Sequence, residues 1–231
     1  MFYLSSKLRF NSLLAVIVVC LLTPNLSQSE ARNAKYRPTE FNRLKLAIIK
    51  LSDTESLYSS MDRWQRYSEK LLHSLAGDDL IAFSGVNPVV NIVFEHKPNA
   101  FAEYPNKLII SNELINLTTS RDEYAFVLAH ELAHFVLKHH SHARTKMLSY
   151  SNPSEAFQTY LNDELAADRL ALNIMKSSGF KQSAAVSILK KLADYRSGDT
   201  TPRLASIYPT LAIRIHKLED QLSNGQRAFL Q

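Results

Sequence analysis

The chain has 231 residues, of which 45% are hydrophobic and 21% are charged, and its formal net charge is +5. This balance excludes a disordered chain, and the presence of only five glycines excludes a collagen-like one. The sequence has no run of basic residues of the kind that follows a nucleic-acid backbone, so no nucleic-acid partner is expected. The length suits one domain with a hydrophobic core.

The N-terminus has the pattern of a secretory signal. Lys7 and Arg9 precede an unbroken apolar run at 13–22, and small polar residues follow it. We therefore expect a signal peptide at 1–29 and an exported domain at 30–231. The apolar run is long enough for only about 15 Å of helix, half of a bilayer's hydrocarbon core, which favours cleavage. The alternative is an uncleaved N-terminus that tethers the protein to a membrane.

Helical spacing of apolar residues predominates after the signal. Helices are expected from 38, at 55–76 (stopped by Gly77), 121–139, 153–176 and 181–196, and from Thr210. β-Branched residues predict two strands, at 89–95 and 107–111, with a loop at 97–106 between them. A second long loop is expected at 197–209. The expected fold class is α+β and predominantly helical, with a small sheet.

The strongest functional signal is an HExxH motif, His130-Glu131-Leu132-Ala133-His134, in the helix expected at 121–139. Residues four apart on a helix lie about 40° apart around its axis, so both imidazoles can bind one metal ion. Glu131 lies about 100° from His130, where its carboxylate can face a metal-bound water. The motif therefore predicts a zinc site with Glu131 as the general base.

A catalytic zinc ion needs three protein ligands and one open position. His140 has the spacing of the HExxHxxGxxH pattern, but Leu137 stands where that pattern requires the glycine that breaks the helix. On an unbroken helix, His140 and His139 both point away from the site. The expected third ligand is Glu164, on the next helix. Asp168, one turn further along the same face, can accept a ring N–H from a ligating histidine.

These residues resemble the HtpX-like zinc metallopeptidases, a family that includes the CAAX prenyl endopeptidases. The family pattern of HExxH followed by ExxAD is matched by 130–134 and by Glu164, Ala167 and Asp168. Asn99-Ala-Phe-Ala resembles the NAFA segment of the family. The resemblance extends over 89–222, which would form the catalytic core, with 38–77 as a helical N-terminal part.

The resemblance implies a zincin-like domain with one Zn²⁺ per chain and endopeptidase activity on unfolded or extended polypeptide. It also implies an edge strand near 108–111 that holds the substrate in extended form. The substrate-binding residues would then be Asn99, Ala100, Phe101, Leu108, Ile109 and Ile110.

One segment departs from the family pattern. Many soluble members carry a His-Pro pair followed by Arg five residues after the proline, and here the residues are Tyr208, Pro209 and Arg214. Tyr208 or Arg214 would help to hold the oxyanion that forms when water attacks the peptide carbonyl.

The expected function is zinc-dependent hydrolysis of unfolded or misassembled proteins in the periplasm, with envelope or membrane-associated proteins as possible clients. Zinc would be held by His130, His134 and Glu164. One alternative is a zinc-binding chaperone or assembly factor with a latent protease site. Another is a structural protein in which the HExxH motif is accidental. Oligomeric state is left open.

Overall fold

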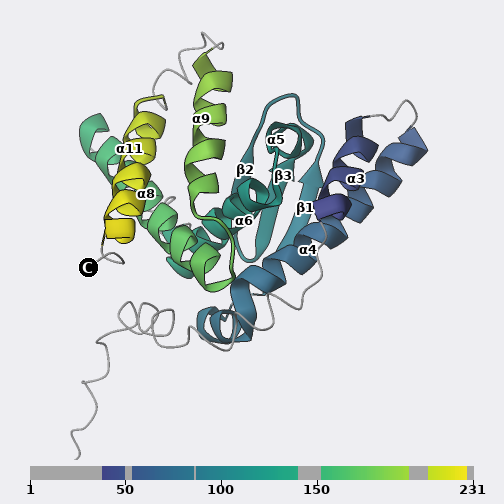
Figure 1. The fold of residues 1–231 in the computed structure, drawn as a ribbon, viewed down its shortest axis with the longest axis horizontal. Helices are drawn as coiled ribbons and strands as arrows, with labels where there is room; N and C mark the ends of the chain where they lie inside the picture. The colour runs from purple at the N-terminus through teal and green to yellow at the C-terminus, as the bar shows by residue number, and fades with distance from the viewer. Residues whose placement is uncertain (1–37, 50–53, 86, 140–151, 198–207, 228–231) are drawn as a thin grey trace, which may run out of the picture.

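The computed structural model describes residues 38–49, 54–85, 87–139, 152–197 and 208–227 (Figure 1). The expected signal peptide at 1–29 and His140 lie outside the described residues. The elements in chain order are α3 (Pro38–Ile49), α4 (Thr54–Ser84), β1 (Val89–Val93), β2 (Ala100–Glu103), β3 (Lys107–Ser111), α5 (Asn112–Leu117), α6 (Arg121–Val136), α8 (Pro153–Ser177), α9 (Ser183–Ser197) and α11 (Tyr208–Arg227). The predicted α+β, predominantly helical fold is confirmed.

Helix α6 lies in the middle of the molecule (Figure 1). It contacts α4 and β2, which lie on one side of it, and α8 and α9, which lie on the other. Twelve of its 16 residues are buried, including polar ones that a surface helix would expose. The helix that carries the HExxH motif is therefore also the central helix of the hydrophobic core.

Aromatic rings pack α3 and α4 against α6. Trp64 lies with its ring centroid 5.4 Å from those of Phe41 and Tyr124, in edge-to-face geometry. The indole N–H of Trp64 donates to the Leu44 carbonyl at 3.0 Å, and the Tyr124 hydroxyl is 2.6 Å from Ser68 Oγ. Because the polar ends of these rings have partners, the rings are buried without leaving unsatisfied groups.

Side chains at 119–123 and on α9 fix the N-terminus of α6. Ser120 Oγ accepts from the Glu123 N–H at 3.1 Å. The buried Glu123 carboxylate accepts from the Thr119 N–H at 2.6 Å, from Ser187 Oγ at 2.6 Å and from Lys191 Nζ at 2.7 Å. Ser187 and Lys191 belong to α9, so one carboxylate joins the start of the motif helix to α9.

The sheet corrects one prediction about the substrate strand. Its strand order is β1-β3-β2, with β1 parallel and β2 antiparallel to β3. Both edges of β3 are therefore occupied, and the expected edge strand at 108–111 is wrong. The edge strands are β1 and β2, and β2 lies within the segment predicted as a loop at 97–106. Only one of its four residues is buried, so the sequence gives little strand pattern there.

One predicted helix end is confirmed and another differs. The helix predicted to stop at Gly77 is broken there, since Gly77 is non-helical at φ 61° and ψ 161°, and a second helical stretch of α4 continues to Ser84. Helix α6 ends at Val136, three residues before the predicted end at 139. Lys138, just beyond that end, has a positive φ of 57°, which turns the following residue out of the helical path.

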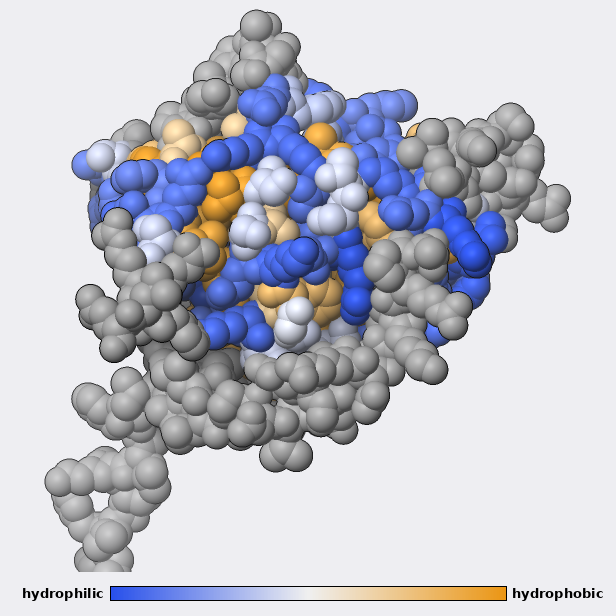
Figure 2. Space-filling model, viewed as in Figure 1, coloured by the Kyte–Doolittle hydropathy of each residue, from blue (hydrophilic) through white to orange (hydrophobic). Residues whose placement is uncertain are grey.

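Hydrophobic side chains are gathered inside the described part of the molecule, around α6. Figure 2 shows one face on which hydrophilic residues cover most of the described surface and hydrophobic surface is confined to small patches. Among the helices of the described residues, none combines the length and hydrophobicity that a membrane span requires.

Candidate metal centre

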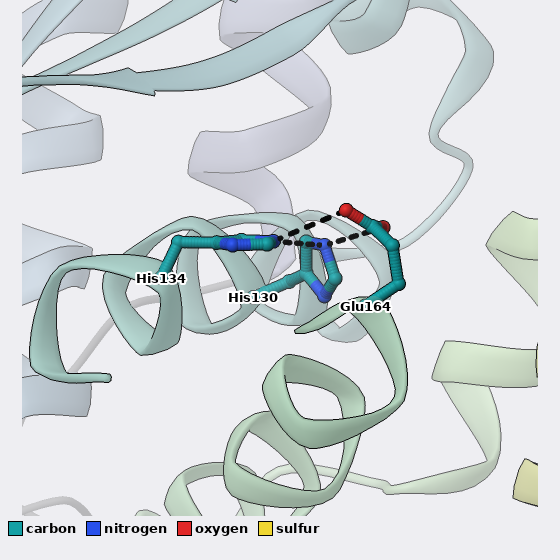
Figure 3. A group of neighbouring side chains, drawn as sticks. All are labelled: His130, His134 and Glu164. Atoms are coloured by element: carbon teal, nitrogen blue, oxygen red, sulfur yellow. Dashed lines mark hydrogen bonds and ion pairs between the residues drawn. The ribbon is translucent and has the colours of Figure 1, made fainter. Parts of the chain in front are cut away.

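Three side chains from two helices converge on one point (Figure 3). His130 and His134 project from α6, and their Nε2 atoms are 3.1 Å apart. The two carboxylate oxygens of Glu164, on α8, each lie 3.5 Å from one of these nitrogens. The three ligand atoms lie within 4.8 Å of one another. Two imidazoles and one carboxylate are the donor set of a catalytic zinc site, so these residues fit Zn²⁺.

The second nitrogen of each histidine is also close to a polar group. Asp168 Oδ1 lies 3.0 Å from His130 Nδ1, and Asp168 is buried. His139 Nδ1 lies 2.9 Å from His134 Nδ1, and Asp163 lies 3.7 Å from the other nitrogen of His139. Such contacts fix the tautomer and the orientation of a ligating histidine.

The contact of His139 differs from the prediction that it points away. That prediction assumed an unbroken helix to 139, whereas the positive φ of Lys138 ends the helical path and turns His139 back toward His134. His139 is thus a site residue that the spacing argument excluded. A glycine or asparagine at 138 would have been a signal for the turn, and lysine is not.

Arg214, on α11, is buried behind the ligands. Its Nη1 donates to Glu164 at 2.6 Å, and its Nε and Nη2 donate to the two oxygens of Asp168 at 2.8 and 2.7 Å. The bidentate pair with Asp168 and the single hydrogen bond to Glu164 fix both carboxylates, and the guanidinium offsets part of their combined charge. Arg214 is therefore a positioning residue for Glu164 and Asp168, which differs from the expected role beside the oxyanion.

The buried charges shift one another's pKa values. Although burial opposes it, the charge of Arg214 lowers the pKa of Asp168 to about 2 and holds the pKa of Glu164 well below its usual range. Burial and Arg214 disfavour a charged His130, but hydrogen bonds to Asp168 and Glu164 prevail and raise its pKa to about 9. A bound metal ion would have to displace that proton.

Glu131 lies between the metal ligands and the edge strand. Burial raises the pKa of Glu131 to about 7, and its carboxylate accepts a hydrogen bond from the backbone N–H of Ala102 on β2. A carboxyl group with a pKa near 7 can both take up and release a proton at neutral pH. Its position and its pKa therefore suit a general base that also acts as an acid.

The ligands open into a cavity of about 370 Å³. Of the predicted substrate-binding residues, Asn99, Ala100 and Phe101 line it. Leu108, Ile109 and Ile110 do not, because they are buried in the central strand β3. That part of the prediction is wrong.

Residues that the sequence did not single out also line the cavity. Among them, Leu192 and Arg196 come from α9, and Tyr160 comes from α8. Tyr160 precedes Glu164 by four residues, so helical spacing could have placed it on the same face. Tyr208 is the first residue of α11, and the placement of its side chain lies outside what the structure describes.

Comparison with known proteins agrees with this geometry. Residues 63–159 match Peptidase family M48. The chain is 26% identical over 173 residues to the mitochondrial metalloendopeptidase OMA1 of Schizosaccharomyces pombe, a match that covers 64% of this chain and 51% of the relative. The protein of the same name from Saccharomyces cerevisiae is 24% identical over 159 residues, covering 58% of this chain and 46% of the relative. The match thus spans about half the length of these relatives.

The matched range contains His130, Glu131 and His134 and ends before Glu164, which the structure brings to the same point. The chain is therefore similar to Peptidase family M48 over the range that carries the HExxH motif, and Glu164 adds a candidate ligand beyond that range. The predicted cofactor, zinc, is confirmed at the level of this family, and the His130–His134–Glu164 group is the place in the described residues that can hold it.

Proposed function

We propose that the protein is a zinc-dependent endopeptidase that cuts unfolded or extended polypeptide chains, with Glu131 as the general base. The observation that carries this proposal is the position of the Glu131 carboxylate. It lies beside two metal ligands on its own helix and is hydrogen-bonded to the edge strand on which a peptide would lie.

His130, His134 and Glu164 would hold Zn²⁺, which would supply Lewis-acid activation of a water and of the peptide carbonyl. The carboxylate of Glu131 would take a proton from the attacking water and deliver it to the leaving amine nitrogen. Asp168 keeps the His130 ring in orientation, and Arg214 holds the Glu164 carboxylate in place.

The free edge of β2 supports an extended substrate. The Ser111 N–H donates to the Asn99 carbonyl at 2.9 Å, so alternation along the antiparallel pair directs the backbone groups of Ala100 and Ala102 away from β3. The Ala102 N–H is bound by Glu131, which leaves the Ala100 N–H and the carbonyls of Ala100 and Ala102 for a substrate. A peptide that adds to this edge must have unpaired backbone groups of its own. Unfolded and extended chains have them, whereas most folded segments do not.

The remaining parts of this proposal rest on the sequence. The signal pattern at 1–29 supports export to a periplasm, where misassembled envelope proteins would be the clients and quality control the role. The NAFA segment and the ExxAD residues support an HtpX-like member of family M48.

A second function is favoured by one observation. Tyr208 stands where many soluble members have a histidine, and this favours a zinc-binding chaperone or assembly factor with a latent site. The same edge strand would then hold clients without cutting them.

The two functions are separated by Glu131→Gln in the zinc-loaded protein, with denatured casein as the substrate. For an endopeptidase, we expect the rate to fall at least about a hundredfold because the general base is lost, while zinc remains bound. Cleavage is followed on gels and zinc by elemental analysis. Equal cleavage by both proteins would contradict the role of Glu131, and no cleavage by either, with zinc bound, would favour the chaperone.

A further inference from the structure

Arg196 lies in the last turn of α9 and lines the cavity of the metal centre. Ile188 and Leu192 line the same cavity. These three residues are spaced four apart, so they form one stripe along the helix, about 12 Å long from Ile188 to Arg196. The wall of the cavity that α9 provides is thus apolar along two turns and ends in a guanidinium group.

The guanidinium of Arg196 has no hydrogen bond or ion pair with any residue in the described part of the chain. The other cavity arginine, Arg214, is fully used by Glu164 and Asp168. Arg196 is nevertheless only partly exposed, and burial together with the charge of Arg214 lowers its pKa, against the attraction of the Glu164 carboxylate. A partly desolvated cation without a partner is unfavourable, and an anion in the cavity would relieve this.

In the described residues, the acidic side chains at the cavity have other partners than Arg196. Glu164 and Asp168 pair with Arg214, and Asp163 lies 3.7 Å from His139. Glu131 faces β2 through the Ala102 N–H.

The place of Arg196 relative to the edge strand is set by its neighbour in the chain. The Tyr195 hydroxyl donates to the His96 carbonyl at 3.3 Å, which holds the end of α9 against the segment that leads into β2. Pro98 and Asn99, at the start of that strand, line the cavity together with Arg196. A peptide on the edge of β2 would therefore have one of its ends near the guanidinium.

We propose that Arg196 is a substrate-binding residue that pairs with a carboxylate of the bound peptide. The carboxylate is either an Asp or Glu side chain near the scissile bond or the C-terminal carboxylate of a short chain. A guanidinium binds either one with two parallel hydrogen bonds. This inference rests on the proposed function in taking a peptide as the ligand, and it adds a preference for acidic peptides.

The test measures binding and does not depend on cleavage. Short fluorescent alanine-rich peptides, with Glu or Gln at each position in turn and with free or amidated C-termini, are titrated against the zinc-loaded Glu131→Gln protein by anisotropy. We expect the peptide with a carboxylate at the preferred position to bind about tenfold more tightly than its neutral partner, a typical value for a charged hydrogen bond. In the double variant Glu131→Gln, Arg196→Gln, the ratio of the affinities for the acidic and the neutral peptide should fall to about one.

Two further variants define the control. Lys190→Gln removes a positive charge from the same helix, but Lys190 pairs with Glu219 at 2.8 Å on another face, so the ratio should remain. Arg196→Lys should keep part of the preference for the acidic peptide, because lysine keeps the positive charge but cannot form the bidentate pair of hydrogen bonds. Selectivity that follows the Glu position identifies a side chain as the ligand, and selectivity lost on amidation identifies the C-terminus.

Equal binding of acidic and neutral peptides, a ratio that survives Arg196→Gln, or no binding of any peptide would overturn the inference. These results are distinguishable from failure of the proposed function. Cleavage by the wild-type protein without acidic preference would refute the role of Arg196 alone. Carboxylate-dependent binding without cleavage would refute the endopeptidase and leave the role of Arg196 standing.

Discussion

Among single residues, Asp168 has two roles at the metal centre. It lies 3.0 Å from the ring nitrogen of His130 and accepts two hydrogen bonds from Arg214. One carboxylate thus orients a ligand and balances a buried cation.

Replacing Asp168 by Asn should therefore lower zinc affinity about 10–100-fold, the usual effect of losing such a contact. Competition with a chromophoric chelator measures this. Glu155→Gln, an exposed position on the same helix, is the matched control and should leave the affinity unchanged. Equal affinities in Asp168→Asn and the control would show that His130 needs no such support.

The sequence could predict the site residues whose position follows from helix geometry. His130, His134 and Glu131 share one helix, and Asp168 follows Glu164 by one turn, so spacing alone relates them. The contact of His139 depends on the positive φ at Lys138. The role of Arg214 depends on how α11 packs against α8, and no local pattern encodes that.

At the scale of elements, the strongly patterned segments were predicted and the weakly patterned one was not. The strand at 107–111 agrees with β3 at both ends, and the helix predicted at 153–176 agrees with α8 to within one residue. β2 was missed because it is short and mostly exposed, and its pairing partner comes after it in the chain. Because β2 was missed, the prediction from sequence assigned the substrate-binding edge to the strand that is β3.

The free edge of β2 leads to a prediction about backbone groups. The Ala100 N–H points away from β3, so Ala100→Pro should leave the sheet intact. It removes one hydrogen bond to the substrate, which should raise KM for a peptide about fivefold. Steady-state kinetics and thermal unfolding measure the two effects.

Phe101→Pro is the matched control. The alternation of the antiparallel pair directs the Phe101 N–H to Ile109, so this substitution should lower the Tm. An unchanged KM in Ala100→Pro would place the substrate elsewhere.

At the scale of the whole molecule, metal binding, protonation and folding are coupled. In protein stripped of metal, the pKa of Glu131 is raised by burial to about 7. Contacts with Asp168 and Glu164, prevailing over burial, raise the pKa of His130 to about 9. Both groups bind a proton more tightly in the folded state than in the unfolded state. Stability from Glu131 is therefore lost between about pH 4.5 and 7, and that from His130 between about 6.5 and 9.

We therefore expect the Tm of the stripped protein to fall by a few degrees from pH 5 to pH 9. The rise in Tm on adding zinc should become larger over the same range, since zinc has to displace the proton of His130. Differential scanning fluorimetry with and without zinc measures both trends. In Glu131→Gln the fall between about pH 4.5 and 7 should be smaller. A zinc effect that shrinks as the pH rises would contradict this coupling.

The central position of α6 also limits how the protein can change during evolution. Twelve of its 16 residues are buried, and the same helix supplies two metal ligands and the general base. A substitution there alters packing and chemistry at once, whereas α11 contributes Arg214 and has many exposed positions. Sequence drift should therefore collect on α11 and on the outer face of α4, and homologues that change α6 should carry compensating changes in α4, α8 or α9.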